Sequence, residues 1–107
     1  MNEIRILSPT GVIGSGFREE SFQRGVDLNP HFIACDAGSA DPGPYYLGSG
    51  TAFVSRLATK RDLELMVTGA LEHGVPVIIG SAGGSGSDQQ VDWTLDILRE
   101  ICSEQRL

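Results

Sequence analysis

Several features that would indicate particular functions are scarce in this chain of 107 residues. Its eight Lys and Arg residues are spread along the sequence, and 14 acidic residues bring the formal net charge to −6. Proteins that bind nucleic acid usually gather basic residues into a patch, so we expect no DNA or RNA partner. No apolar run approaches the roughly 20 residues that span a bilayer, so we expect no membrane segment.

Cysteine is also scarce, and its spacing indicates neither a metal site nor a disulfide framework. Cys35 and Cys102 are isolated, with no CxxC pairing and no His nearby. Zinc sites and disulfide-rich scaffolds normally show paired or clustered ligands. The N-terminus also lacks a basic region followed by an apolar signal core. These absences favour a cytoplasmic protein without a metal centre, and the sequence identifies no cofactor.

The composition that remains is that of a folded domain. Apolar residues make up 40% of the chain and charged residues 21%, which is ordinary for a soluble globular protein. The length allows one domain over residues 1–107. We expect either a complete α/β domain or the N-terminal part of a larger domain or enzyme.

Hydrophobic patterns predict three strands that alternate with three helices. The strands are expected at residues 3–7, 31–35 and 75–79, and the helices at 17–25, 59–73 and from Ser87 or Asp88 onward. The apolar run 32–35 is typical of a strand buried on both faces of a parallel sheet. The order predicts a three-layer, Rossmann-like open parallel sheet of about three strands, with helices on both faces.

Two capping boxes are indicated at the starts of the later helices. Thr59 and Asp62 resemble a shortened box, and Ser87 with Gln90 has the usual spacing. The second helix is expected to end at Gly74, and the alternative to a start at Thr59 is an earlier one near Ala52. The buried face predicted for the last helix contains Val91, Thr94, Leu95, Leu98, Ile101 and Cys102.

Glycine is abundant, and 11 of the 14 glycines lie in three loops that follow the three predicted strands. These are the first loop (residues 8–17), the second loop (36–50) and the third loop (80–88). Ligands of open parallel sheets bind outside the carboxyl ends of the strands, so we expect the loops to form one polar small-molecule site. Candidate ligand-binding residues of the first loop are Gly11, Gly14 and Gly16.

The first loop does not match a dinucleotide site. Its glycines have the spacing GxxGxG, whereas the dinucleotide fingerprint is GxGxxG. Asp36, about 20 residues after Gly16, would be the carboxylate that holds a ribose in such a site. The alternative is that the loop is only a tight turn from strand to helix.

The second loop carries the side chains best suited to chemistry. Asp36 and Asp41 are the candidate catalytic residues, and Gly38 and Ser39 are candidate ligand contacts. The carboxylates are suited to general acid–base work, to holding a substrate hydroxyl or to binding a metal. The alternative is that both only shape the loop through Asx turns.

The third loop is suited to an anion because it leads into a helix N-terminus. Backbone N–H groups and the positive end of the helix dipole favour phosphate or carboxylate there. Nucleotide hydrolysis is not expected, because the loop lacks the Lys of a P-loop. The alternative is that Ser87 and Asp88 merely cap the helix. The candidate ligand-binding residues are Gly80, Ser81, Gly83, Gly84 and Ser85.

Two segments resemble the N-terminal part of the acyclic terpene utilisation family (AtuA-like). They are FIACDAGSADPGPYYLGSG at 32–50 and VPVIIGSAGGSGSD at 75–88. Members of that family are longer and are associated with bacterial catabolism of small organic compounds. The resemblance implies a small-molecule site at Asp36, Gly38, Ser39, Asp41, Gly80, Ser81, Gly83 and Gly84.

The chain stops at Leu107, so we expect either a fragment or a protein whose site is completed by another subunit. Three parallel strands leave both sheet edges unpaired, which favours a homo-oligomer or a partner subunit. The favoured function is a small-molecule catabolic enzyme or enzyme half, similar to a lyase, hydratase or isomerase, that binds an anionic metabolite. The alternatives are a non-catalytic nucleotide- or phosphate-binding module, or a truncation without independent activity.

Overall fold

The computed structural model describes residues 2–38 and 44–107 and confirms a mixed α/β fold with a small parallel sheet. The three strands lie in the order β1–β2–β3, with Ile6 opposite Phe32 and Asp36 opposite Gly80. The strands are β1 (Ile6–Leu7), β2 (Phe32–Asp36) and β3 (Val77–Gly80). The helices are α1 (Glu19–Val26), α2 (Pro44–Ser49), α3 (Arg56–His73) and α4 (Asp88–Gln105), and one 3₁₀ turn, η1, covers Ala82–Gly84.

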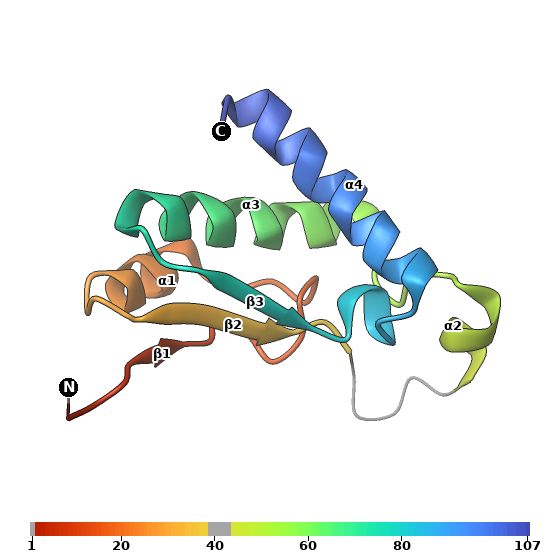
Figure 1. Ribbon diagram of the computed structural model, residues 1–107, viewed down its shortest axis with the longest axis horizontal. Helices are drawn as coiled ribbons and strands as arrows, with labels where there is room; N and C mark the ends of the chain where they lie inside the picture. The colour runs from red at the N-terminus through yellow and green to blue at the C-terminus, as the bar shows by residue number, and fades with distance from the viewer. Residues whose placement is uncertain (1, 39–43) are drawn as a thin grey trace.

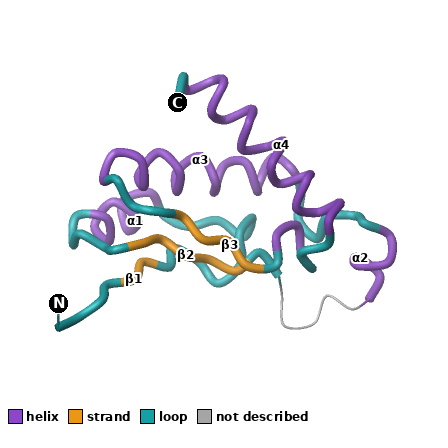
Figure 2. The backbone as a smooth tube through the Cα atoms, in the orientation of Figure 1, coloured by secondary structure: helices purple, strands orange, loops and turns teal. Residues whose placement is uncertain are grey.

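The helices α1, α3 and α4 all lie on the same side of the sheet (Figures 1 and 2). The strand order is the reason. Right-handed crossovers between strands that follow one another in sequence place successive helices on one face. Helices reach the second face only where the strand order reverses, as it does in Rossmann folds. The described residues therefore form two layers, and the helices predicted on the other face are not among them.

The core lies between the sheet and this helical layer. Ile33 of β2 is completely buried, and Cys35 of the same strand is nearly so. The helices contribute one side chain cluster to the same core: Phe22, Val26, Leu63, Met66, Ala70, Ile97 and Ile101. Each of the larger side chains contributes about 1.5–3 kcal/mol by leaving water, so this single cluster accounts for the association of the two layers.

The opposite face of the sheet is apolar but uncovered by the described residues. Ile6 is 60% exposed and Ile78 is 54% exposed, and Ala34 on the central strand is half-buried between them. Burial along β2 alternates, with Ile33 and Cys35 buried and their neighbours less so. The prediction of a strand buried on both faces is therefore wrong for this chain.

Glycine and serine set the helix ends as predicted. Gly74 closes α3 with a left-handed φ of 65°, and Ser87 caps α4 by accepting the Gln90 N–H at 3.3 Å. The start of α3 is earlier than predicted, because Ser55 is its cap and its hydroxyl accepts the Ala58 N–H. Asp62 therefore lies within α3, and its interpretation as a capping residue is wrong.

The buried face of α4 is rotated relative to the prediction. Val91 and Leu95 are each 38% exposed, whereas Ile97 is completely buried. Thr94 and Ile101 are buried as expected. Within the described parts of the chain, no helix has the length and apolar character needed to cross a membrane.

Candidate functional site

The three glycine-rich loops meet at the carboxyl ends of the strands, as expected for a parallel sheet. The N–H of Ile13 in the first loop donates to the Asp36 carbonyl at 2.9 Å. The N–H of Ala37 donates to the Gly80 carbonyl at 2.8 Å, which joins the second loop to the third. Gly38 approaches the third loop so closely that a Cβ there would lie 2.8 Å from the Gly84 carbonyl oxygen.

Asp36 ends β2, and its side chain is exposed at the edge of the uncovered face. One carboxylate oxygen, Oδ1, accepts the Gly38 N–H at 2.8 Å, which is the contact expected of an Asx turn. The residue also borders an open hollow of about 340 Å³ whose walls include Ile6, Ala34 and Ile78. Asp36 thus shapes the second loop and is accessible to a ligand.

Ser81 follows β3 directly and adopts a left-handed backbone, with φ 51° and ψ 43°. The other described non-glycine residues with positive φ, Asn29 and Arg106, follow the ends of α1 and α4, where such a conformation is ordinary. Ser81 ends no helix, and its side chain does not cap η1. It faces Gly38, whose Cβ would lie 2.9 Å from the Ser81 Cβ. A left-handed serine costs about 1–3 kcal/mol.

Three glycines of the third loop, Gly83, Gly84 and Gly86, have positive φ, and several amides of this loop already have acceptors. Gly83 and Gly84 have φ of 76° and 121°. The Gly84 N–H donates to the Ser81 carbonyl at 2.8 Å, and the Ser85 N–H donates to Gln90 Oε1 at 2.7 Å. An anion would compete with these internal acceptors. Anion binding by the third loop stays a prediction.

Gln90 is a buried polar residue of α4. Its side chain connects this helix to the third loop and to the segment around α2. Its Nε2 donates to the carbonyls of Tyr46 and Thr51, both at 3.0 Å. Its Oε1 accepts the N–H and the hydroxyl of Ser85. Sequence reasoning identified Gln90 only as a capping partner of Ser87, because its carbonyl partners lie about 40 residues away along the chain.

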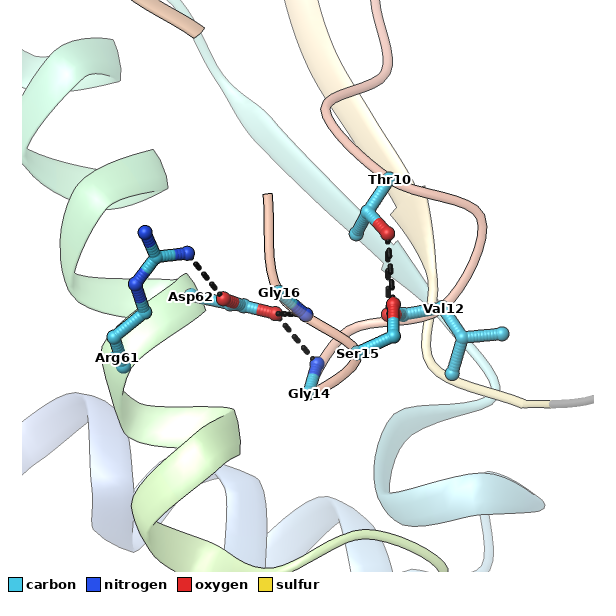
Figure 3. A network of polar contacts seen from close by, with 7 residues as sticks. All are labelled: Thr10, Val12, Gly14, Ser15, Gly16, Arg61 and Asp62. Carbon is cyan, nitrogen blue, oxygen red and sulfur yellow. Dashed lines mark hydrogen bonds and ion pairs between the residues drawn. The ribbon is translucent and has the colours of Figure 1, made fainter. Parts of the chain in front are cut away.

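The first loop is bound by a carboxylate of the chain itself (Figure 3). Asp62 Oδ2 accepts the N–H of Gly14 at 2.7 Å and that of Gly16 at 3.1 Å. Arg61 donates to Asp62 Oδ1 at 2.9 Å. Two of the amides predicted to bind a ligand therefore have an internal acceptor. Gly11 is the remaining glycine of this loop. A Cβ added there would have no atom within 4 Å.

Two predicted residues, Ser39 and Asp41, lie outside the described residues, so a pairing of Asp41 with Asp36 stays a prediction. Across residues 2–38 and 44–107, no group of three or more His, Cys, Asp or Glu side chains is arranged to hold a metal ion. Cys35 is packed in the core, and burial raises the pKa of its thiol above the ordinary value. This side chain therefore stays neutral at physiological pH and is a poor nucleophile.

Asp36 and Ser81 are thus predicted residues that are exposed and lie together, on either side of the buried Gly38. They come from the ends of two neighbouring strands, and Gly38 contacts both of them. Comparisons of the chain with protein-family models, curated proteins and solved structures found no match.

Proposed function

We propose that this chain forms an enzyme, or half of an enzyme, that acts on a small hydroxylated or carboxylated metabolite. The reaction is similar to that of a lyase, hydratase or isomerase, with Asp36 as general acid–base. The backbone of Ser81 carries this proposal. A strained, non-glycine residue that ends no helix, beside an accessible carboxylate, is typical of catalytic positions.

The chemistry follows from how the two side chains are held. The Gly38 N–H fixes one oxygen of Asp36, which leaves the other to take a proton from carbon or oxygen and to return it to a leaving group. The Ser81 hydroxyl, across Gly38, supplies a hydrogen-bond donor for charge that develops on the substrate. No step in this scheme requires the amides of the first loop.

The resemblance to the acyclic terpene utilisation family supports a catabolic role in the cytoplasm. The uncovered apolar face supports a second component, since parallel sheets are almost always covered on both faces. In this proposal a homo-oligomer or a partner subunit supplies the missing layer and completes the three-layer arrangement. The wall of the hollow beside Asp36 would then be closed by that component.

The alternative is a non-catalytic nucleotide- or phosphate-binding module. Such a module needs backbone amides that are free to bind an anion. Four of the predicted amides, those of Gly14, Gly16, Gly84 and Ser85, have acceptors within the chain, which weakens this alternative for the first loop and for part of the third. The module would be stabilised by a phosphate compound and would convert no metabolite.

Asp36→Asn is expected to remove turnover while leaving the fold intact. The amide oxygen of Asn still accepts the Gly38 N–H, but the side chain no longer transfers protons, so turnover should fall by about 100-fold or more. Substrates are first found by thermal shift with a panel of hydroxy and carboxy metabolites, and turnover is followed by NMR. Asp96→Asn, at an exposed position of α4, is the matched control. Unchanged turnover in the Asp36 variant would refute the acid–base role.

Ser81→Gly is expected to stabilise the protein and to impair turnover. Glycine removes the left-handed strain but adds backbone freedom to the unfolded chain, so we expect a gain of about 0.5–1 kcal/mol in urea denaturation. Ser81→Ala is the matched control, because it removes the hydroxyl and keeps the strain. If glycine gives no gain in stability, or if both variants keep full turnover, Ser81 is not a strained catalytic position.

A further inference from the structure

We infer that the first loop is an anion-binding nest whose anion is the carboxylate of Asp62, and that Asp62 is a positioning residue for Asp36. The role of Asp36 rests on the proposed function, whereas the occupancy of the loop by Asp62 does not. Gly14 and Gly16 then fasten the loop to α3 instead of binding a metabolite.

The geometry of the loop is that of an anion site. Gly14 and Gly16 have φ of 100° and 88°, which turns their N–H groups toward the same carboxylate oxygen of Asp62. Backbone amides that converge in this way make a concavity for an anion. Glycine is required at position 14 for a second reason, because a Cβ would lie 2.7–3.0 Å from the side chain of Val54.

The negative charge of the buried Asp62 carboxylate is balanced by Arg61, on the side opposite the glycine amides. The Asp62 side chain is only 1% exposed, so water cannot replace its partners. The Arg61 guanidinium donates to Oδ1 and also lies over the Phe17 ring, 5.0 Å from its centroid. The view in Figure 3 shows Asp62 between this guanidinium and the two glycine amides. Both carboxylate oxygens therefore have donors.

A direct path leads from this nest to Asp36. Ile13 precedes Gly14, is 1% exposed and donates its N–H to the Asp36 carbonyl at 2.9 Å. Ile13 thus holds the end of β2, and Asp62 in turn holds Gly14, the residue that follows Ile13. If the first loop shifts, the Asp36 carbonyl loses its backbone donor and keeps only the weaker Cys35 thiol at 3.3 Å. The Asp36 backbone is then held less firmly, and the direction of its side chain changes with it.

The test uses the occupancy of the nest by a small free anion. Asp62→Ala removes the carboxylate and leaves the amides, so formate should enter and restore their hydrogen bonds. We expect a lower melting temperature for this variant, with a recovery in sodium formate that exceeds the recovery in sodium chloride at equal ionic strength. Formate should also return the NMR amide signals of Gly14 and Gly16 toward their wild-type positions. Asp62→Asn fills the same space and should show no such rescue.

Three results would overturn the inference. The first is an equal effect of formate and chloride on Asp62→Ala, and the second is formate rescue of Asp62→Asn to the same extent. The third is an unshifted Ile13 amide signal in Asp62→Asn, which also decides the matter if the alanine variant does not fold. Both Asp62 oxygens accept, so the side-chain NH2 of asparagine must face either Arg61 or the two glycine amides. We therefore expect the Ile13 amide to exchange with deuterium about tenfold faster in this variant. These amide signals test the nest without any substrate, whereas the turnover of Asp36→Asn tests the proposed function, so the two failures are told apart.

Discussion

Replacement of Gln90 by leucine is expected to lower the free energy of unfolding by about 2–4 kcal/mol. Leucine has a similar volume but no polar atoms, so the loss arises from the groups left behind. The Thr51 carbonyl loses its side-chain donor and the Ser85 N–H loses its acceptor, both in part-buried positions. The Tyr46 carbonyl, in contrast, keeps the Gly50 N–H at 3.1 Å. Each buried polar group without a partner costs about 1–3 kcal/mol.

Urea denaturation followed by circular dichroism measures this change, and Gln89→Leu is the matched control. Gln89 is the preceding residue in the same helical turn and is exposed, so its replacement should alter stability by about 0.5 kcal/mol at most. If both variants lose the same small amount, the four hydrogen bonds of Gln90 do not hold the third loop, and the position of Ser81 must have another cause.

Local patterns were sufficient for the three strands and for α1, α3 and α4, but not for α2 and η1, which lie in segments predicted as the second and third loops. Gly74 and Ser87 were recognised from the sequence because helix caps depend on the conformation of one or two residues. The apolar run in β2 also identified the central strand, since its position needs no knowledge of the partners. The three loops could be placed at one edge because parallel strands all end there.

Strand order and helix rotation could not be predicted, because both depend on contacts distant in sequence. The order β1–β2–β3 and its reversed alternatives share the same strand–helix pattern, yet only the first leaves one face of the sheet uncovered. In α4 the apolar side chains of Val91 and Leu95 fitted the predicted stripe, but the packing of Ile97 and Ile101 against the core turned them outward.

The same limitation applies to the site. Asp36 and Gly38 were predicted from their place at a strand end, and the structure brings them next to Ser81. The sequence predicts Asp62 as part of a helix cap, whereas its partners Gly14 and Gly16 lie more than 40 residues away along the chain. A polar residue inside the apolar stripe of a helix was the available signal, because such a residue needs a partner when it is buried.

Gly38→Ala is expected to separate the second loop from the third and to lower the free energy of unfolding by about 3 kcal/mol. The reason is steric. A Cβ at this position would lie 2.8 Å from the Gly84 carbonyl oxygen and 2.9 Å from the Ser81 Cβ, and real Cβ atoms do not approach other atoms so closely. Gly11→Ala is the matched control, because its Cβ would meet no atom within 4 Å.

The Gly38→Ala variant also tests whether Asp36, on the second loop, and Ser81, on the third loop, belong to one site. The Gly38 N–H holds the Asp36 carboxylate, so a shift of this backbone should reduce turnover as strongly as Asp36→Asn does. Adding Ser81→Gly to Gly38→Ala removes one of the two close contacts, and the Gly84 carbonyl maintains the other. The double variant should therefore recover only part of the lost stability, with a coupling energy of about 1 kcal/mol in a double-mutant cycle. A coupling near zero would mean that Gly38 and Ser81 do not press against each other, and the two loops would then not form one site.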